Sequence, residues 1–107
     1  MQVDLAVVKY LRKIATQCRA EDDSPGQCVT SYYVNVTSAA DGDYTAVRGT
    51  DSCPQLFTGN DPLVDLETVV TNDFDWPVAA RFVRLNPQSW AVRIALRWEI
   101  YGCDNFN

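Results

Sequence analysis

The sequence predicts an all-β fold, a small antiparallel β-sandwich or distorted jelly-roll barrel forming a single domain over residues 1–107. Three observations lead to this prediction. Short segments rich in β-branched and aromatic residues alternate between apolar and polar positions, turn residues separate these segments, and helix signals are weak throughout. With 47% hydrophobic residues, a chain of this length can build one core.

The first half of the chain contains four candidate elements. An apolar run over Val3–Val8 is followed by a mixed apolar and basic segment, Tyr10–Thr16. An amphipathic helix over Val3–Lys13 is an alternative, which two consecutive valines and the lack of a clear cap disfavour. Val29–Thr37 alternates with period two and predicts a strand, and Tyr44–Arg48, after a turn, predicts its hairpin partner.

The second half shows a clearer pattern. Leu63–Val70 is a strand candidate, Asn72–Pro77 is expected to be a loop, and Ala80–Leu85 is expected to be a strand closed by Asn86-Pro87. Near the C-terminus, alternate residues divide into two faces. The face expected to fill the core holds Ile94, Leu96, Trp98 and Ile100, and the face expected to point outward or line a groove holds Ala95, Arg97, Glu99 and Tyr101.

Composition argues against catalysis and against polyanionic partners. The formal net charge of −5 disfavours nucleic acid and anionic lipid. The absence of histidine excludes Ser-His-Asp and Cys-His catalysis, and no nucleophile elbow or phosphate-binding loop is present. The acidic pairs Asp22-Asp23 and Asp41 with Asp43 are interpreted as solvated charges, with carboxylates from separate loops as an alternative metal site. We expect no enzyme activity, no cofactor and no metal.

Four cysteines in a short chain indicate an oxidising, extracellular compartment, so we expect a secreted protein. Cys18, Cys28, Cys53 and Cys103 allow three pairings. We favour Cys18–Cys28, which would clip one loop, with Cys53–Cys103, which would tie the C-terminus to the body. The alternative is four buried free thiols in a cytosolic protein.

Several segments resemble one known family. The segments are Gln2–Leu5, Ile14–Gln17, Phe57–Asn60, Ala80–Trp90, Arg93–Arg97 and Glu99–Cys103. In this order, over nearly the whole chain, they resemble the motifs of discoidin domains, also called factor V and factor VIII type C domains. This resemblance implies a non-enzymatic β-sandwich that binds a ligand through loops at one end.

The chain also departs from the family pattern. The resemblance implies a shortened member, which lacks the family's first strands, two of its three ligand-facing loops and the cysteine that pairs with the terminal one. Cys103 therefore loses its usual partner, which favours Cys53 as the replacement. The family's Thr-Gln-Gly becomes Thr16-Gln17-Cys18, which supports a local clip to Cys28. Disulfides would then offset the smaller core.

The best candidate for a ligand site is the polar segment Arg19–Val29, which contains a Pro-Gly turn. By the resemblance it matches the one ligand-facing loop that remains. The ligand-binding residues predicted in it are Arg19, Glu21, Asp22, Asp23, Ser24 and Gln27. Arg97 is a further candidate, because its planar fork suits a carboxylate, a phosphate or sugar hydroxyls, with an ion pair as the alternative. The loop lacks a pair of bulky apolar residues, which disfavours deep membrane insertion.

The tryptophans differ in expected role. Trp98 is expected in the core, and Trp90 is expected to pack locally in a turn. Trp76 is the tryptophan we expect to be exposed, and it is a candidate for stacking on a sugar. Asn35-Val36-Thr37 is a glycosylation sequon inside a predicted strand, where occupancy is in question.

We weigh three functions. The favoured one is a lectin-like module that binds carbohydrate, with the sugars of bacterial surface glycolipids such as lipopolysaccharide as candidates and a role in adhesion or host defence. The second is a phosphatidylserine-binding membrane module. The third is a protein-interaction or collagen-binding module, which requires a sizeable exposed apolar patch.

Overall fold

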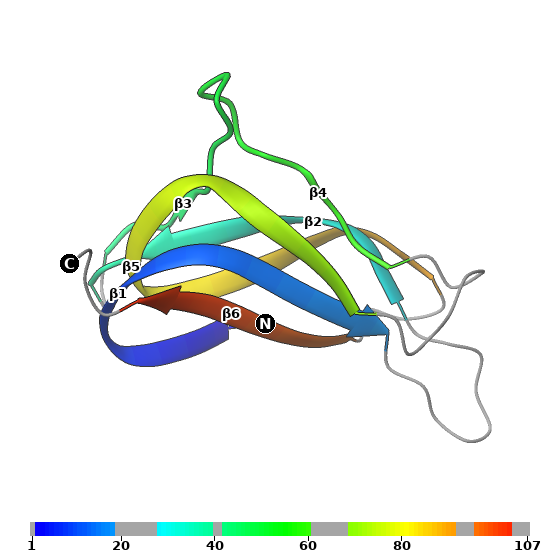
Figure 1. Ribbon diagram of the computed structural model, residues 1–107, viewed down its shortest axis with the longest axis horizontal. Coiled ribbons are helices and arrows are strands. Elements are labelled where there is room, and N and C mark those ends of the chain that lie inside the picture. Colours follow the sequence, from blue (N-terminus) through cyan, green and yellow to red (C-terminus); the bar gives the residue numbers. More distant parts are fainter. Residues whose placement is uncertain (1, 19–27, 40–41, 61–68, 92–95, 104–107) are drawn as a thin grey trace.

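The computed structural model describes residues 2–18, 28–39, 42–60, 69–91 and 96–103 (Figure 1). The described part of the chain is an antiparallel, all-strand structure, which confirms the predicted fold class. The strands are β1 (Gln2–Cys18), β2 (Cys28–Thr37), β3 (Thr45–Ala46), β4 (Phe57–Thr58), β5 (Val69–Ala91) and β6 (Leu96–Cys103). No helix in these ranges is long and apolar enough to cross a membrane.

The strands follow the order β3-β2-β5-β1-β6, and β4 also pairs with β2. Two long strands, β1 and β5, pair along both of their halves and bend together, as Figure 1 shows at its left side. Residues 13–17 of β1 lie between β5 and β6, whereas residues 82–84 of β5 lie between the start of β1 and β2. The two bent strands therefore contribute to both layers of the sandwich.

The bend in β1 has a local cause. The pairing register of β1 with β5 is interrupted between Asp4 and Lys9. Within this stretch Ala6 has a φ of 71°, a left-handed conformation that is uncommon for a residue other than glycine. The Ala6 amide donates a hydrogen bond of 2.8 Å to Oδ1 of Asp4, which stabilises the turn.

The bend in β5 corrects one prediction. Asn72–Pro77 was expected to be a loop, but it lies inside β5. The β1 partners of β5 pass from Asp73, opposite Lys13, to Val78, opposite Leu11, so residues 74–77 have no β1 partner. A proline is tolerated there because its missing N–H breaks no ladder hydrogen bond.

A second proline also lies inside β5, although it was expected to end a strand. Asn86-Pro87 was expected to end a strand at Leu85, yet β5 continues to Ala91. Beyond Arg84, β5 pairs with β2 on one side and has no β1 partner on the other. Such an edge position accepts proline, so the strand passes through it.

The other strand predictions can be compared directly. Val29–Thr37 is confirmed as β2, and part of Tyr44–Arg48 forms β3, in which Thr45 pairs with Val36. Val3–Val8 and Tyr10–Thr16 belong to the single strand β1, so the helical alternative is wrong. Of Leu63–Val70 only Val69 and Val70 are described, at the start of β5.

The core lies between the two layers. It is formed by Leu11, Ile14, Val29, Tyr32, Val34, Val36, Val47, Phe57, Phe74, Ala80, Val83 and Leu85. Tyr32 is fully buried and its ring stacks on Phe57 at a centroid distance of 5.5 Å, whereas Tyr33 is half-buried on the other face. Burial of each large side chain contributes roughly 1.5–3 kcal/mol.

One predicted disulfide is present and the other is not. Cys18 and Cys28 are bonded. The expected Cys53–Cys103 bond is wrong, because Cys53 is a free, exposed cysteine. Cys53 lies on the long loop between β3 and β4, which stands away from the sheet, whereas Cys103 ends β6 on the opposite side (Figure 1). A disulfide requires Cα atoms within about 7 Å of each other.

Candidate functional site

The Cys18–Cys28 disulfide closes one end of the sandwich. It joins the last residue of β1 to the first residue of β2, with a Cα–Cα distance of 4.4 Å, and both cysteines are buried. The predicted ligand residues of the clipped loop lie outside the described residues: Arg19, Glu21, Asp22, Asp23, Ser24 and Gln27. The disulfide places both ends of this loop at the same point of the fold.

Arg97 lies directly beside this disulfide. On β1, Gln17 is opposite Arg97 of β6 on one side and opposite Val69 of β5 on the other. The next pair along, Cys18 with Leu96, is at the level of the disulfide itself. We call the surface formed by Gln17, the two bonded cysteines, Val69 and Arg97 the disulfide end.

Arg97 faces outward, as predicted. Its side chain is exposed, and in the described ranges it forms no ion pair, which disfavours the ion-pair alternative. The next outward residue on β6, Glu99, instead accepts a hydrogen bond of 2.9 Å from the hydroxyl of Tyr101. This bond to the Glu99 carboxylate raises the pKa of Tyr101 above its ordinary value. The guanidinium of Arg97 is therefore left to face solvent.

A shallow hollow of about 170 Å³ lies at this position. It is lined by Ala15, Thr16, Gln17, Val69, Arg97, Trp98, Glu99 and Tyr101. The lining combines a guanidinium, a carboxylate and an amide with apolar surface from Val69 and the aromatic rings. This mixture suits a polar ligand with hydroxyl groups better than a purely apolar one.

The two exposed tryptophans lie in different parts of β5, Trp76 in the bend over residues 74–77 and Trp90 next to the last residue of the strand. Trp76 is 45% exposed, as predicted, but it is seven residues from Val69, which is about 20 Å along a strand. The structure therefore does not bring Trp76 together with Arg97. Trp90 was expected to pack locally, but it is 48% exposed and pairs with Val29 beside Cys28. No sequence signal indicates this position, because Asn86-Pro87 predicts the end of the strand before Trp90.

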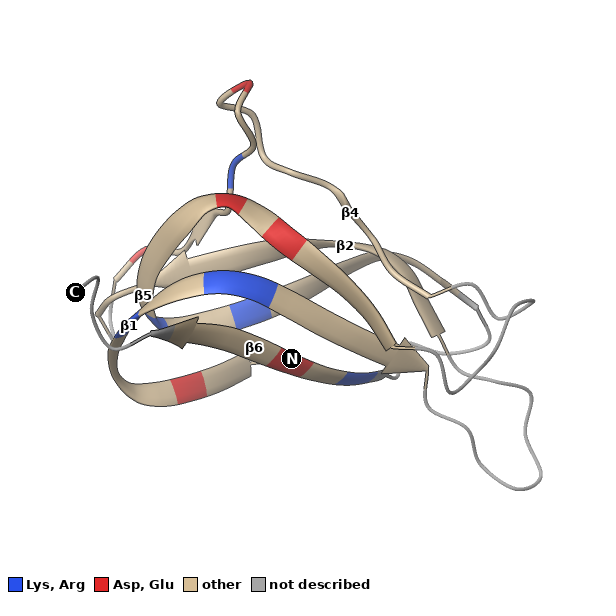
Figure 2. Ribbon diagram, viewed as in Figure 1, with Lys and Arg blue, Asp and Glu red and all other residues tan. Residues whose placement is uncertain are grey.

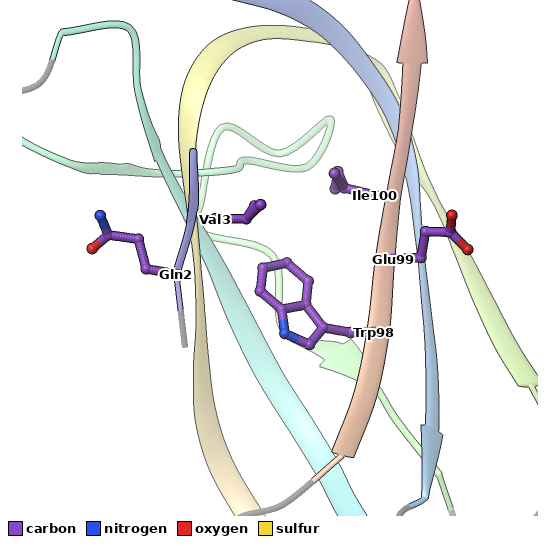
Figure 3. Close-up of a pocket in the computed structure, with 5 residues that line it drawn as sticks. All are labelled: Gln2, Val3, Trp98, Glu99 and Ile100. Atoms are coloured by element: carbon purple, nitrogen blue, oxygen red, sulfur yellow. The ribbon is translucent and has the colours of Figure 1, made fainter. Parts of the chain in front are cut away.

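Trp98 lines a second hollow, of about 380 Å³, between β6 and the start of β1. Figure 3 shows Trp98 and Ile100 pointing from β6 toward Val3, while Gln2 and Glu99 point away. Val3, Trp98 and Ile100 pack against the core. The hollow is thus an opening into the core between two strands. The position of Trp98 agrees with the structural role that was expected for it.

The described acidic residues do not gather into a metal site. Within the described ranges no three Cys, Asp or Glu side chains are placed to hold an ion. Asp51 and Asp75 line a hollow of about 300 Å³ beside the β3–β4 loop, but each accepts a backbone N–H, from Cys53 and Thr50 respectively. These two carboxylates stabilise the loop.

Charged side chains are also dispersed. Figure 2 shows Lys and Arg scattered over β1, β5 and β6, with Asp and Glu among them.

Comparison with known proteins identifies the family. The family model for the F5/8 type C domain matches residues 1–100. Neurexin-4 of Drosophila melanogaster is 37% identical over 97% of this chain, and human neuropilin-1 is 32% identical over 96%. The chain covers 8% and 11%, respectively, of the length of these two proteins.

A solved structure agrees with this match. Discoidin II of Dictyostelium discoideum superimposes with a TM-score of 0.74 and 29% identity, over 94% of this chain and 35% of that one. The strand arrangement, the matched motifs and the family model coincide. The chain therefore belongs to the F5/8 type C, or discoidin, domain family.

Proposed function

We propose that this discoidin-type domain is an extracellular, non-enzymatic module that binds carbohydrate at the disulfide end. The ligand is held by Arg97 together with polar residues of the clipped loop, Glu21, Asp22 and Asp23 foremost. The observation that carries this proposal is the position of Arg97, exposed and without a carboxylate partner among the described residues, beside the Cys18–Cys28 disulfide.

Three physical arguments support a sugar ligand. The disulfide restricts the loop before binding, which lowers the entropic cost of ordering the loop when a ligand binds. This matters for sugars, because weakly binding ligands cannot easily offset such a cost. The guanidinium offers a planar set of donors to hydroxyl or acidic groups. The net charge of −5 disfavours nucleic acid and anionic membranes. Bacterial surface glycolipids such as lipopolysaccharide are the first candidates, with adhesion or host defence as the role.

The first test is a glycan array that includes bacterial lipopolysaccharides, probed with the oxidised protein. We expect reproducible binding to a related group of sugars, competed by the free sugar. Arg97→Gln and a triple alanine variant at Glu21, Asp22 and Asp23 should each weaken it by about tenfold or more. The matched control is Arg48→Gln, on the loop after β3, which should bind normally. A blank array, or full binding by both variants, contradicts the proposal.

A membrane-binding function is the second candidate, and one observation favours it. Val69 of the disulfide end is 56% exposed, and Trp90, which pairs with Val29 next to Cys28, is 48% exposed, so that both could enter a lipid surface. Sedimentation with phosphatidylserine vesicles tests this candidate. Binding that falls on Trp90→Ala but not on Arg97→Gln would favour the membrane over the sugar.

A further inference from the structure

A second polar surface lies on the outer face of the layer formed by β1, β5 and β2. Its centre is Arg84 of β5, which is directly opposite Gln2 of β1 on one side and Asn35 of β2 on the other. The neighbours of Arg84 in β5, Val83 and Leu85, are buried in the core. Because side chains alternate along a strand, Arg84 points outward, and the two amides flank it across the strands.

Arg84 is held in place by uncharged partners. Its Nε donates a hydrogen bond of 2.9 Å to Oε1 of Gln2, and its guanidinium carbon lies 3.8 Å from the ring centroid of Tyr44. In the described part of the chain no carboxylate pairs with it. The side chain is therefore positioned while its charge stays unneutralised.

Arg81, three residues earlier, provides the contrast. It donates two hydrogen bonds, of 2.9 and 3.2 Å, to the two carboxylate oxygens of Asp4. These bonds hold the pKa of Asp4 below its ordinary value. Arg81 is thus already occupied by an internal anion, whereas Arg84 presents both terminal nitrogens of its fork to the surface.

A hollow of about 410 Å³ lies beside Arg84. It is lined by Gln2, Asn35, Arg84, Leu85, Asn86 and Pro87, and none of these residues is acidic. Its volume falls in the range of small-molecule sites. Each of the three amides can donate and accept hydrogen bonds, as sugar hydroxyls require, and the guanidinium matches a planar carboxylate.

We propose that this surface, the Arg84 hollow, is a binding site for a sugar that carries a carboxylate, of the uronic acid class. The carboxylate pairs with the free nitrogens of Arg84, and the hydroxyls bond to the amides of Asn35 and Asn86. The site is separate from the disulfide end, because Asn35 is seven residues, or about 20 Å, along β2 from Cys28.

The test is a titration of the ¹⁵N-labelled chain with methyl β-D-glucuronide, in which binding is monitored through the amide chemical shifts. The protein is produced in bacteria so that Asn35, which lies in a sequon, carries no glycan. We expect saturable shifts at Asn35, Arg84 and Asn86. Methyl β-D-glucoside, which lacks the carboxylate, should cause no saturable shift at these positions.

Three variants locate the effect. Arg84→Gln should weaken glucuronide binding by about 10- to 100-fold, since it removes a charge-assisted hydrogen-bonded pair. Arg84→Lys keeps the charge but loses the fork, so it should cause a smaller loss. The matched control Arg81→Gln removes an equal charge from the same strand and should bind normally.

The outcomes separate this proposal from the previous one. Arg97→Gln should leave glucuronide binding intact even where it abolishes array binding, because the two arginines lie at different sites. Unchanged glucuronide binding by Arg84→Gln, or equal binding of the neutral glucoside, would overturn the proposal. Equal shifts with sodium sulfate alone would also overturn it, since they would indicate a simple anion site.

Discussion

Single residues show what the Phe57–Asn60 motif contributes to this fold. The Phe57 ring stacks on Tyr32, and the Asn60 side chain accepts a hydrogen bond of 2.8 Å from the buried Thr16 hydroxyl. Between them, Gly59 approaches the backbone of β2 so closely that a Cβ atom would collide with the carbonyl of Val29. The motif thus connects β4 to β1 and β2. The amino-acid sequence of the motif alone does not indicate these contacts.

Tyr32 makes the core sensitive to alkaline pH. Burial raises the pKa of Tyr32, whose hydroxyl accepts a hydrogen bond of 3.1 Å from Asn72. Below the unfolded-state pKa of about 10, the Tyr32 hydroxyl is protonated in both the folded and the unfolded state, so its contribution to stability is complete. As the pH rises through the folded-state pKa, the unfolded state ionises first and that contribution is lost.

We therefore predict that the free energy of unfolding is lower at about pH 10.5 than at about pH 8, and that Tyr32→Phe reduces this difference. The variant should also have a free energy of unfolding that is about 1 kcal/mol lower at neutral pH, because the hydrogen bond from Asn72 is lost. Urea unfolding at both pH values measures the effect. The control Tyr33→Phe, on the half-buried face, should retain the wild-type pH dependence, and an unchanged dependence in Tyr32→Phe would refute the argument.

At the scale of elements, the disulfide between β1 and β2 closes a loop with a sequence separation of 10. A loop of this length restricts the unfolded chain by roughly 2–3 kcal/mol. We predict that replacing both Cys18 and Cys28 with alanine lowers the free energy of unfolding by about this amount. It should also weaken ligand binding at the disulfide end, because the loop must then be ordered on binding.

Chemical denaturation and array binding of the double variant measure both effects. The matched control is Cys53→Ser, which should change neither, because Cys53 is exposed and free. Equal destabilisation by the control would mean that Cys53 forms a structural bond after all. Full array binding by the double variant would mean that the clip does not position the ligand loop.

Elements with a local signal were predictable, and those shaped by distant contacts were not. Alternation identified Val29–Thr37 and the outward positions of Arg97 and Glu99, because period two follows from strand geometry alone. β5 was not recognised as one strand of 23 residues, because its two prolines read as breaks. Whether a proline interrupts a sheet depends on the neighbouring strand, which the local sequence does not specify.

The candidate site was predictable to a similar degree. The Cys18–Cys28 disulfide and the outward position of Arg97 could be foreseen from cysteine spacing, strand alternation and the family resemblance. Trp90 and the Arg84 hollow could not, because both depend on the register between β5 and its neighbours. That register is a property of the folded sheet, set by long-range pairing.

For the whole molecule, the strand order determines what can act together. It brings the end of β1, the start of β2 and the starts of β5 and β6 to one end, where the disulfide and Arg97 lie together. Trp76 lies at the opposite bend, and the Arg84 hollow lies on an outer face. From this arrangement we expect a carbohydrate to bind at the disulfide end.

The most direct measurement is an amide chemical-shift titration of the ¹⁵N-labelled, oxidised chain with the oligosaccharide that binds best on the array. Saturable shifts are expected at Gln17, Val69 and Arg97, with Ala46 and Asn86 unmoved. Shifts centred on Ala46 and Asn86 with the first three residues unmoved, or no saturable shift anywhere, would contradict this expectation.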